Sequence, residues 1–224
     1  MKLKWYAHAS VLFENEGLRI IADPYSPAEL GFDTITEPAD IVVRSSADDL
    51  GHCYAEMITG NPIVVTATEL EPEGVTVRGI HFTPIHAKES LIYKERPRDN
   101  AMYRFSLDGL HIAHLGDVGN RMTEEQLDGL RNVDVMLAPT GGPPTIDLDD
   151  LMDALNILQP RVFIPVHYKL PGALPKMLPI TAFTDRFAPG QVMWNDSSEI
   201  ELTRANLPNS MKVIVLKPST APAD

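Results

Sequence analysis

The chain opens with a short-period alternation of apolar and polar residues. The apolar residues Leu3, Trp5, Val11 and Phe13 lie among polar neighbours. A second apolar run follows at 18–22. A period of two is typical of strands with one buried face, so two or three antiparallel strands are predicted, turned around residues 15–17. Asp23-Pro24 then ends this unit as a turn.

Short apolar runs continue along the chain and predict many more strands. The candidates are 41–44, 62–66, 75–80, 101–107, 111–115, 133–137, 161–166, 192–194, 200–203 and 211–216. Because one open sheet rarely holds so many strands, two sheets or a barrel are expected.

Two helices are predicted between these strands. Thr123, with Gln126 three residues later, forms a capping-box pattern before a helix over 124–130. Asp147 begins a second helix that runs to Leu158 and carries its apolar residues on one face. Strand-rich halves with amphipathic helices outside them predict a layered α/β architecture.

The domain organisation is predicted to be simple. No Pro/Gly/Ser-rich linker and no repeat of fixed period is evident, so one domain over 1–217 is expected, with a disordered tail at 218–224. The chain has 224 residues, 44% of them hydrophobic, which is enough for a substantial core. The segment 87–100 lacks clear periodicity and gathers basic residues, so a surface loop is expected there, with a lid as one alternative.

The formal net charge of −12 narrows the range of partners. Nucleic acids and anionic membrane surfaces repel an acidic protein, so neither is expected to bind. The N-terminal segment lacks the apolar stretch of a signal peptide, and the lone Cys53 excludes an intramolecular disulfide framework. We therefore expect a cytoplasmic protein with a small-molecule substrate, and a homo-oligomer is left open.

Imidazole and carboxylate side chains recur where the predicted strands end. They are Asp48, Asp49 and His52 after 41–44, His86 after 75–80, Asp117 after 111–115, and His167 after 161–166. Side chains at strand ends can converge on one cleft because the backbone there is rigidly placed. Imidazole with carboxylate suits Zn²⁺, Mn²⁺ or Fe²⁺, whereas the lack of thiolates argues against a structural zinc cluster. A single histidine after a strand is more often structural, so this spacing alone is weak support for a metal site.

Three parts of the chain carry a family resemblance. They are WYAHASVLFE with GLRIIADPY, then TPIHAKES, and then the stretch from HIAHLGDVGN to LQPRVFIPVHYK. In this order they resemble the metallo-β-lactamase fold superfamily, specifically its branch of small metal-dependent hydrolases of the ascorbate-6-phosphate lactonase type. The resemblance implies an αββα sandwich with a metal cleft at one edge between the sheets. It also implies hydrolysis of a small-molecule ester, lactone or phosphoester by a metal-activated water.

The resemblance also implies roles for individual residues. Asp117 corresponds to the bridging aspartate of the family, His167 to its last histidine ligand and His86 to its isolated histidine. The family signature His-x-His-x-Asp-His is incomplete in the loop after strand 41–44. An alignment with one extra residue keeps His52 as the last histidine and places Ala47, Asp49 and Gly51 at the other positions. The ungapped alignment gives Ser46, Asp48, Leu50 and Gly51, and we prefer the gapped one because it retains His52.

The retained residues imply one divalent ion, Zn²⁺ or Mn²⁺, where the family holds two. Its predicted ligands are His52, His86, Asp117, His167 and, as an additional carboxylate, Asp49. Because Gly51 replaces the motif aspartate that positions the attacking water, Asp48 or Asp49 is predicted to orient that water or accept its proton, beside Asp117.

The predicted substrate-binding residues are His8, Lys169 and Arg96. His8 lies in the AHAS segment, which in the family runs near the cleft. Lys169 and Arg96 can bind a phosphate or a carboxylate, although such residues often only face solvent. A second hypothesis is a catalytically inactive, metal-free pseudoenzyme that serves as a ligand-binding or oligomeric scaffold. The missing motif histidines favour the pseudoenzyme, and the retained aspartate and histidines favour the hydrolase.

Overall fold

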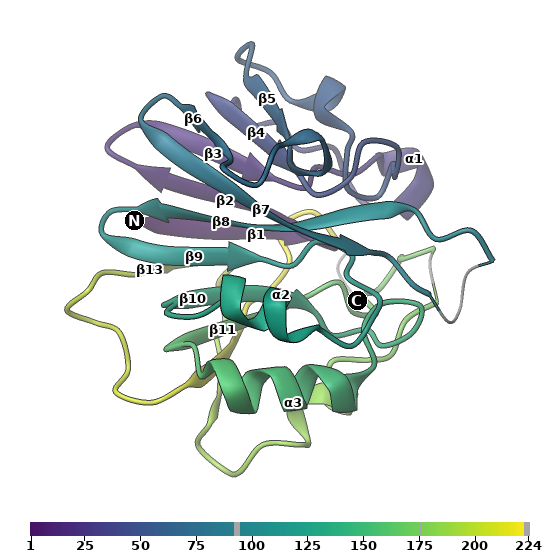
Figure 1. Cartoon of the computed structure of the whole chain (residues 1–224), viewed down its shortest axis with the longest axis vertical. Coiled ribbons are helices and arrows are strands. Elements are labelled where there is room, and N and C mark those ends of the chain that lie inside the picture. Colours follow the sequence, from purple (N-terminus) through teal and green to yellow (C-terminus); the bar gives the residue numbers. More distant parts are fainter. Residues whose placement is uncertain (92–94, 175, 222–224) are drawn as a thin grey trace.

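The strands form two sheets that pack face to face (Figure 1). They are seen in a computed structural model, which describes residues 1–91, 95–174 and 176–221. The six-stranded sheet has the order β13-β1-β2-β3-β4-β5, and the eight-stranded sheet has the order β12-β14-β11-β10-β9-β8-β7-β6. The first contains β1 (Lys2–Ala7), β2 (Ser10–Asn15), β3 (Leu18–Ala22), β4 (Ile41–Arg44), β5 (Ile63–Thr66) and β13 (Glu199–Glu201). The second contains β6 (Val75–Val77), β7 (Ile80–Lys88), β8 (Asp99–Leu107), β9 (Leu110–His114), β10 (Val135–Pro139), β11 (Val162–Val166), β12 (Val192–Trp194) and β14 (Lys212–Val215).

Strands β1 to β3 form the antiparallel unit that the alternation predicts. Leu3 pairs with Phe13 and Trp5 with Val11, and all four side chains are fully buried. A slip of one residue would turn this whole set toward the opposite face, so the apolar pattern fixes the register.

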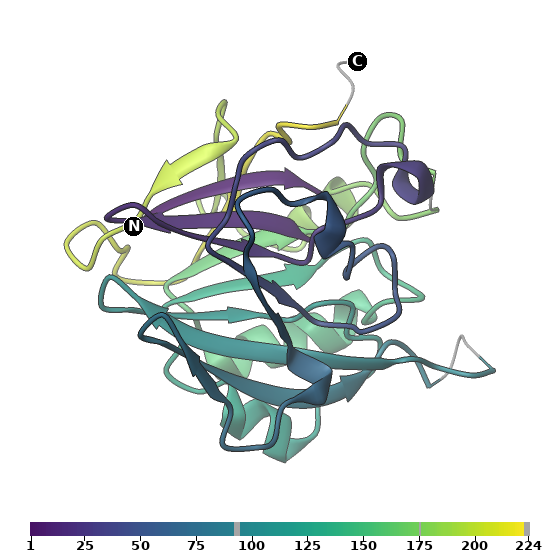
Figure 2. The same cartoon turned by 90° about the horizontal axis from the view of Figure 1, so that it is seen from above.

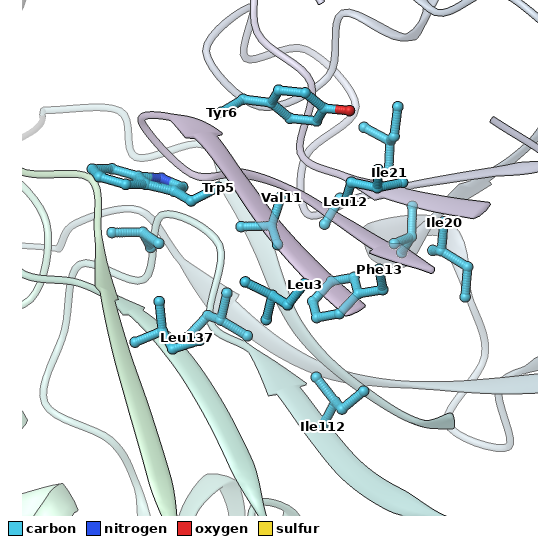
Figure 3. Packing of buried hydrophobic residues seen from close by; sticks show 14 of the residues in the cluster. Leu3, Trp5, Tyr6, Val11, Leu12, Phe13, Ile20, Ile21, Ile112 and Leu137 are labelled. Atoms are coloured by element: carbon cyan, nitrogen blue, oxygen red, sulfur yellow. The ribbon is translucent and has the colours of Figure 1, made fainter. Parts of the chain in front are cut away.

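The principal core lies between the two sheets. In Figure 3, Val11 and Phe13 point toward Ile112 and Leu137 of the other sheet, whereas Leu12 points to the opposite face. Leu12 is buried there as well, so this sheet is covered on both sides. Burial on both faces accounts for the near-continuous apolar sequences of β2 and β3.

The helices lie outside the sheets. Helices α2 (Glu124–Gly129) and α3 (Leu148–Leu158) cover the outer face of the eight-stranded sheet (Figure 1). The predicted capping box is confirmed, because Thr123 and Gln126 exchange hydrogen bonds of 3.2 and 3.0 Å. The remaining helical segments are α1 (Pro27–Leu30), α4 (Thr181–Thr184) and the 3₁₀ turns η1 (Ala55–Met57) and η2 (Ala67–Glu69).

The αββα class predicted from the sequence is confirmed, with helical layers of unequal thickness. On the six-stranded sheet the α-helical layer is reduced to the four-residue α1. Across the described ranges of the chain, no helix is long and apolar enough to cross a membrane.

The carboxyl ends of the parallel strands meet at one edge of the sandwich. Strands β3, β4 and β5 are parallel in one sheet, and β9, β10 and β11 in the other. Backbone hydrogen bonds join the two sheets at this edge, from Ala101 to Ser45 at 2.8 Å and from His167 to His8 at 2.9 Å. Figure 2 shows the same two sheets seen from above. Loops from both sheets are therefore held against one another.

Two predicted segments differ from the structure. The predicted strand 75–80 is divided by a tight turn at Arg78 and Gly79, both with positive φ, because β6 and β7 pair as a hairpin. The first and last residues of the predicted loop 87–100 are paired residues of β7 and β8. Residues 92–94 in its middle lie outside the described residues.

The predicted disorder at 218–224 needs a correction for its first part. The backbone N–H groups of Ser219 and Thr220 donate to the Tyr6 carbonyl at 2.8 and 3.1 Å. Thr220 is only 8% exposed. This stretch is polar in sequence but is anchored by backbone hydrogen bonds to β1, which no side-chain pattern reveals. Residues 222–224 lie outside the described residues.

Candidate metal centre

Three histidine side chains from distant parts of the chain meet at this edge. His8 lies in the β1–β2 turn, His52 in the loop after β4, and His167 directly after β11. The ring centroids are 3.7 Å apart for His8 and His167, 5.0 Å for His8 and His52, and 5.4 Å for His52 and His167. All three residues are buried, and one nitrogen atom from each lies within 4.8 Å of the others. This spacing lets one cation contact all three rings.

The backbone of His8 and His167 is strained. Their φ angles are 50° and 52°, values that residues other than glycine rarely adopt. The His8 carbonyl accepts the His167 backbone N–H at 2.9 Å and the Trp5 indole N–H at 3.0 Å. A left-handed φ costs about 1–2 kcal/mol per residue, and such strain is concentrated at functional sites. The two rings therefore enter the centre from a backbone that long-range hydrogen bonds fix.

Asp23 holds His52 from behind. Its Oδ2 atom lies 2.9 Å from His52 Nδ1, and both side chains are fully buried. Asp23 also accepts hydrogen bonds from the Ser45 backbone, the Ser45 hydroxyl and the Tyr103 hydroxyl, at 2.8, 2.6 and 3.3 Å. Because Nδ1–H donates to Asp23, Nε2 is left facing the centre, where it makes no hydrogen bond. A carboxylate behind an imidazole is the arrangement that orients metal-binding histidines.

The three imidazoles differ in protonation. Burial and the neighbouring rings lower the pKa of His8 well below its usual range and that of His167 to about 3. Burial opposes charge on His52 as well, but its hydrogen bond to Asp23 and the charge of Asp117 outweigh burial and raise its pKa to about 9. His8 and His167 are thus neutral at pH 7, and an ion that binds His52 displaces a proton.

Asp117 joins the imidazoles from the loop after β9. Its Oδ1 atom lies 3.3 Å from His167 Nε2 and 4.0 Å from His52 Nε2. Its backbone N–H donates to Asn100 Oδ1 at 3.0 Å. Gly116, just before it, has a φ of 56°, and a Cβ atom there would lie 2.4 Å from Asn100 Oδ1. Only glycine allows the loop to approach so closely, so Gly116 helps to fix Asp117 beside two rings.

Asp49 and Glu89 form an acidic cluster with Asp117. One carboxylate oxygen from each of these three residues lies within 4.8 Å of the others. Arg98 Nη1 lies 3.2 Å from Asp49 Oδ2 and 3.8 Å from Glu89 Oε1. Burial favours the neutral form of Asp49, but the charge of His52, a hydrogen bond with Glu89 and the charge of Arg98 together hold its pKa well below its usual range. Asp49 is therefore an ionised carboxylate.

The imidazoles, Asp49 and Asp117 line a cavity of about 480 Å³. Its other lining residues include Asp48, Gly51, Arg98, Thr145 and Lys176. This volume lies within the range of small-molecule sites, about 300–1,000 Å³. The cavity can hold a small ligand directly over the three rings.

The donor set fits a divalent metal ion. His8 Nδ1, His52 Nε2 and His167 Nδ1 are buried and make no hydrogen bond with any residue that the structure describes. Buried polar atoms without partners are costly, and a cation that accepts their lone pairs removes that cost. Neutral imidazole with carboxylate is a set that Zn²⁺, Mn²⁺ and Fe²⁺ accept. His8, His52, His167 and Asp117 are the residues that would hold such an ion.

The structure brings together four of the five metal ligands predicted from the sequence. His52, Asp117 and His167 meet at the centre, and Asp49 lines the same cavity. Residue 51 also faces the centre, because a Cβ atom at Gly51 would lie 3.4 Å from His8 Nε2. Both alignments place residue 51 at a motif position, but only the gapped one includes His52, which lies in the centre. The ungapped one would use Leu50, which is 44% exposed, so the gapped alignment fits the structure better.

The assignment of His86 as a ligand does not fit this arrangement. His86 is exposed, its Nε2 lies 3.2 Å from the Leu70 carbonyl, and it lines two other cavities. Glu89, three residues later, is buried and faces Asp117 instead. The family resemblance assigned His86 as the isolated histidine, whereas this chain places the carboxylate of Glu89 near Asp117.

The predicted substrate-binding and catalytic residues are also distributed differently. His8 lies in the centre itself rather than beside it. Lys169 and Arg96 are exposed and do not line the cavity, whereas Lys176 and Arg98 do. Asp48 lines the cavity, but its Oδ1 accepts a 3.3 Å hydrogen bond from the Ser46 hydroxyl. The sequence analysis identified the basic segment 87–100, which contains Arg98. It did not predict that Arg98 would lie opposite Glu89 in the β7–β8 hairpin.

Comparison with known proteins gives a family match and several relatives. Residues 2–167 match the family model of the beta-lactamase superfamily domain. A metal-dependent hydrolase of Carboxydothermus hydrogenoformans is 26% identical over 191 residues, covering 75% of this chain and 84% of that protein. Another from Nanoarchaeum equitans is 27% identical over 187 residues, covering 75% and 84%.

Solved structures give the same result at the level of the fold. The crystal structure of a putative zinc-dependent hydrolase of the metallo-beta-lactamase superfamily from Thermotoga maritima has a TM-score of 0.75 and 27% identity, covering 96% of this chain and 97% of that one. A putative metal-dependent hydrolase from Parabacteroides distasonis has a TM-score of 0.64 at 18% identity, covering 96% and 93%, which shows a shared fold alone.

Proposed function

Because the chain belongs to the beta-lactamase superfamily domain family, we propose that it is a metal-dependent hydrolase that cleaves a small-molecule ester, lactone or phosphoester. One observation carries the proposal: three buried imidazoles, each with a nitrogen atom that makes no hydrogen bond, converge beside Asp117 in a cavity of about 480 Å³. A purely structural cluster would satisfy these nitrogen atoms within the protein. The names of the relatives as metal-dependent hydrolases support the same reading.

The proposed cofactor is one divalent ion, Zn²⁺ or Mn²⁺, held by His8, His52, His167 and Asp117. Such an ion polarises the scissile carbonyl or phosphoryl group and lowers the pKa of a water molecule toward neutrality. Three imidazoles with one carboxylate suit a borderline ion, whereas Mg²⁺ and Ca²⁺ prefer oxygen ligands throughout.

The protein residues around the ion have separable roles. Asp23 fixes the orientation of the His52 ring, so that Nε2 faces the cavity. Asp49 stays ionised and is therefore a weak base, which suits it to accept a hydrogen bond from the attacking water and orient it. Lys176, which lines the same cavity, is placed to pair with a carboxylate or phosphate on the substrate.

The test combines metal content with hydrolysis, measured on the same tag-free protein. We expect about one Zn²⁺ or Mn²⁺ per chain, and hydrolysis of an aryl ester, a lactone or a phosphodiester that EDTA abolishes and the ion restores. His167→Ala should lose both the ion and the activity, whereas the exposed His86→Ala should lose neither. If neither ion binds after incubation with the metal-free protein, the proposal fails and a metal-free scaffold becomes the better hypothesis.

A further inference from the structure

The β7–β8 hairpin brings Arg98 directly opposite Glu89. The last pair of the ladder is Lys88 with Asp99, so the next residues outward are Glu89 and Arg98. The Glu89 backbone N–H donates to the Arg98 carbonyl at 3.2 Å. Strand register, and not only side-chain attraction, therefore places the guanidinium beside the acidic side of the centre.

The Glu89 backbone is also fixed by contacts with residues other than Arg98. Gly119 packs so closely on it that a Cβ atom at Gly119 would lie 1.0 Å from the Glu89 carbonyl oxygen. The Gly119 backbone N–H also donates to the Lys88 carbonyl at 3.0 Å. The loop that carries Asp117 thus clamps the end of β7, and no larger residue fits at position 119 without moving it.

Asp49 is fixed by its own loop. Its backbone N–H donates to the Ser46 hydroxyl at 3.1 Å, and its Oδ1 accepts the Gly51 backbone N–H at 2.8 Å. Asp49 and Glu89 therefore belong to separate elements, each fixed by contacts that do not involve the Arg98 side chain. Arg98 Nη1 bridges them, at 3.2 and 3.8 Å.

The acidic side has the composition of a position for a hard cation. The oxygens of Asp49, Glu89 and Asp117 lie within 4.8 Å of one another. His52 Nε2, a proposed ligand of the imidazole-held ion, lies 4.0 Å from Asp117 Oδ1, so the acidic position adjoins that ion and shares Asp117 with it. Carboxylate oxygens suit Mg²⁺ and Mn²⁺. A second ion could therefore bind beside the imidazole-held ion if the guanidinium were absent.

The exposed fractions of the three side chains show how Arg98 can compensate the negative charge of the acidic side. The Glu89 side chain is 1% exposed, that of Asp49 is 17% exposed, and that of Arg98 is 48% exposed. A buried carboxylate without a counter-charge destabilises a protein, whereas a half-exposed guanidinium retains part of its hydration. Arg98 can therefore neutralise the pair at small cost to itself.

We propose that Arg98 is the built-in counter-cation of the acidic side and restricts the centre to a single metal ion. The inference rests on the proposed function, because it concerns the number of ions at the same site. Arg98 here is a positioning residue: it acts through Asp49 and Glu89, which its Nη1 atom contacts, and its charge excludes a second divalent cation from them.

The test counts Mn²⁺ ions bound by the metal-free full-length protein. Calorimetric titration and plasma mass spectrometry after gel filtration give the number for the wild type and for Arg98→Met, Arg98→Gln and Arg98→Lys. We expect Arg98→Met and Arg98→Gln to bind one more ion per chain than the wild type. Arg98→Lys, which retains the charge, should bind the wild-type number. Arg121→Met is the matched control, since Arg121 is an exposed arginine paired with Asp150 and Asp153 outside this cavity.

Location is tested by removing the carboxylate at the same time. The double variant Glu89→Gln, Arg98→Met should lose the additional ion, because the acidic position then lacks one of its three carboxylates. Circular dichroism and melting temperature establish which variants are folded, and two uncharged replacements keep the test usable if one of them fails to fold.

The outcomes separate this inference from the proposed function. The inference predicts one more ion in the uncharged variants than in the wild type, and a wild type that binds two ions would overturn it. Equal numbers in all folded variants would overturn it, even if the wild type binds one ion and hydrolyses its substrate. A wild type that binds no ion would overturn the proposed function, while a single ion gained by Arg98→Met would still support the role of Arg98.

Discussion

The two sides of the candidate metal centre are built on different principles. On the imidazole side, His8, His52 and His167 are buried, and backbone bonds or Asp23 hold them from behind. On the acidic side, the carboxylates come from a loop and a hairpin end, and Arg98 reaches them from solvent. One side is preorganised by supports behind its rings, and the other has a cation, Arg98, placed directly against its carboxylates.

This difference teaches where the chain has room for an ion. Imidazole nitrogen atoms without hydrogen bonds gain from a bound cation, whereas carboxylates that already face a guanidinium gain less, because the cation must compete with it. The imidazole side should therefore dominate metal affinity. Substitutions of the imidazole ligands, and of the residues that support them, test this difference between the two sides most directly.

The largest effect is expected from His8→Ala. His8 supplies one of three converging rings, so its loss should weaken Zn²⁺ or Mn²⁺ binding by more than about 100-fold, beyond the range of residues that only support a ligand. Competition with a chromogenic chelator measures the affinity. His86→Ala, which removes an exposed histidine, should leave it unchanged. The reverse ranking would show that the sequence-based choice of His86 was right and that the structural centre does not hold the ion.

The fold could be predicted from the sequence because its signals are local. Period-two alternation marked β1 and β2, the Thr123 capping box marked α2, and apolar runs marked β9 to β11. Parallel strands place their carboxyl ends at one edge, so Asp117 and His167 could be assigned to one cleft before any contact was known.

The rest of the site depends on contacts between distant parts of the chain, which the sequence pattern does not reveal. His8 enters through a left-handed turn that the His167 N–H and Trp5 support. The resemblance placed His8 near the cleft, but nothing in the sequence showed that this turn would bring its ring into the centre itself. Glu89 is placed by the length of β7 and the close approach of Gly119. The family resemblance favoured His86 as the isolated histidine, but the register of β7 leaves that side chain exposed and outside the centre.

A smaller effect is expected from Asp23→Asn, which leaves every ligand in place. Asp23 fixes the tautomer and orientation of His52 through the 2.9 Å contact with Nδ1. Loss of its charge should weaken metal binding by about 10- to 100-fold. Asp134→Asn is the control: Asp134 is also buried and binds Arg204 and the His111 backbone, far along β9 from Asp117. Equal losses of affinity in the two variants would mean that general destabilisation, not the orientation of His52, is responsible.

The smallest effect is a pH dependence of the metal-free protein, which also separates the imidazoles from one another. The pKa of His52 is raised to about 9, above its usual value near 6.5, so its stabilisation is fully present below about pH 6.5 and is lost as the pH rises through 9. The depressed pKa values of His8 and His167 act in the opposite sense, because their cost in folding free energy appears only as the pH falls below about 6.5.

Urea unfolding in EDTA should therefore show a fall in stability on the order of 1 kcal/mol between pH 7.5 and 8.5. His52→Gln keeps a donor for Asp23 but cannot titrate, so its stability should stay level over this interval; an equal fall in that variant would assign the effect to another group.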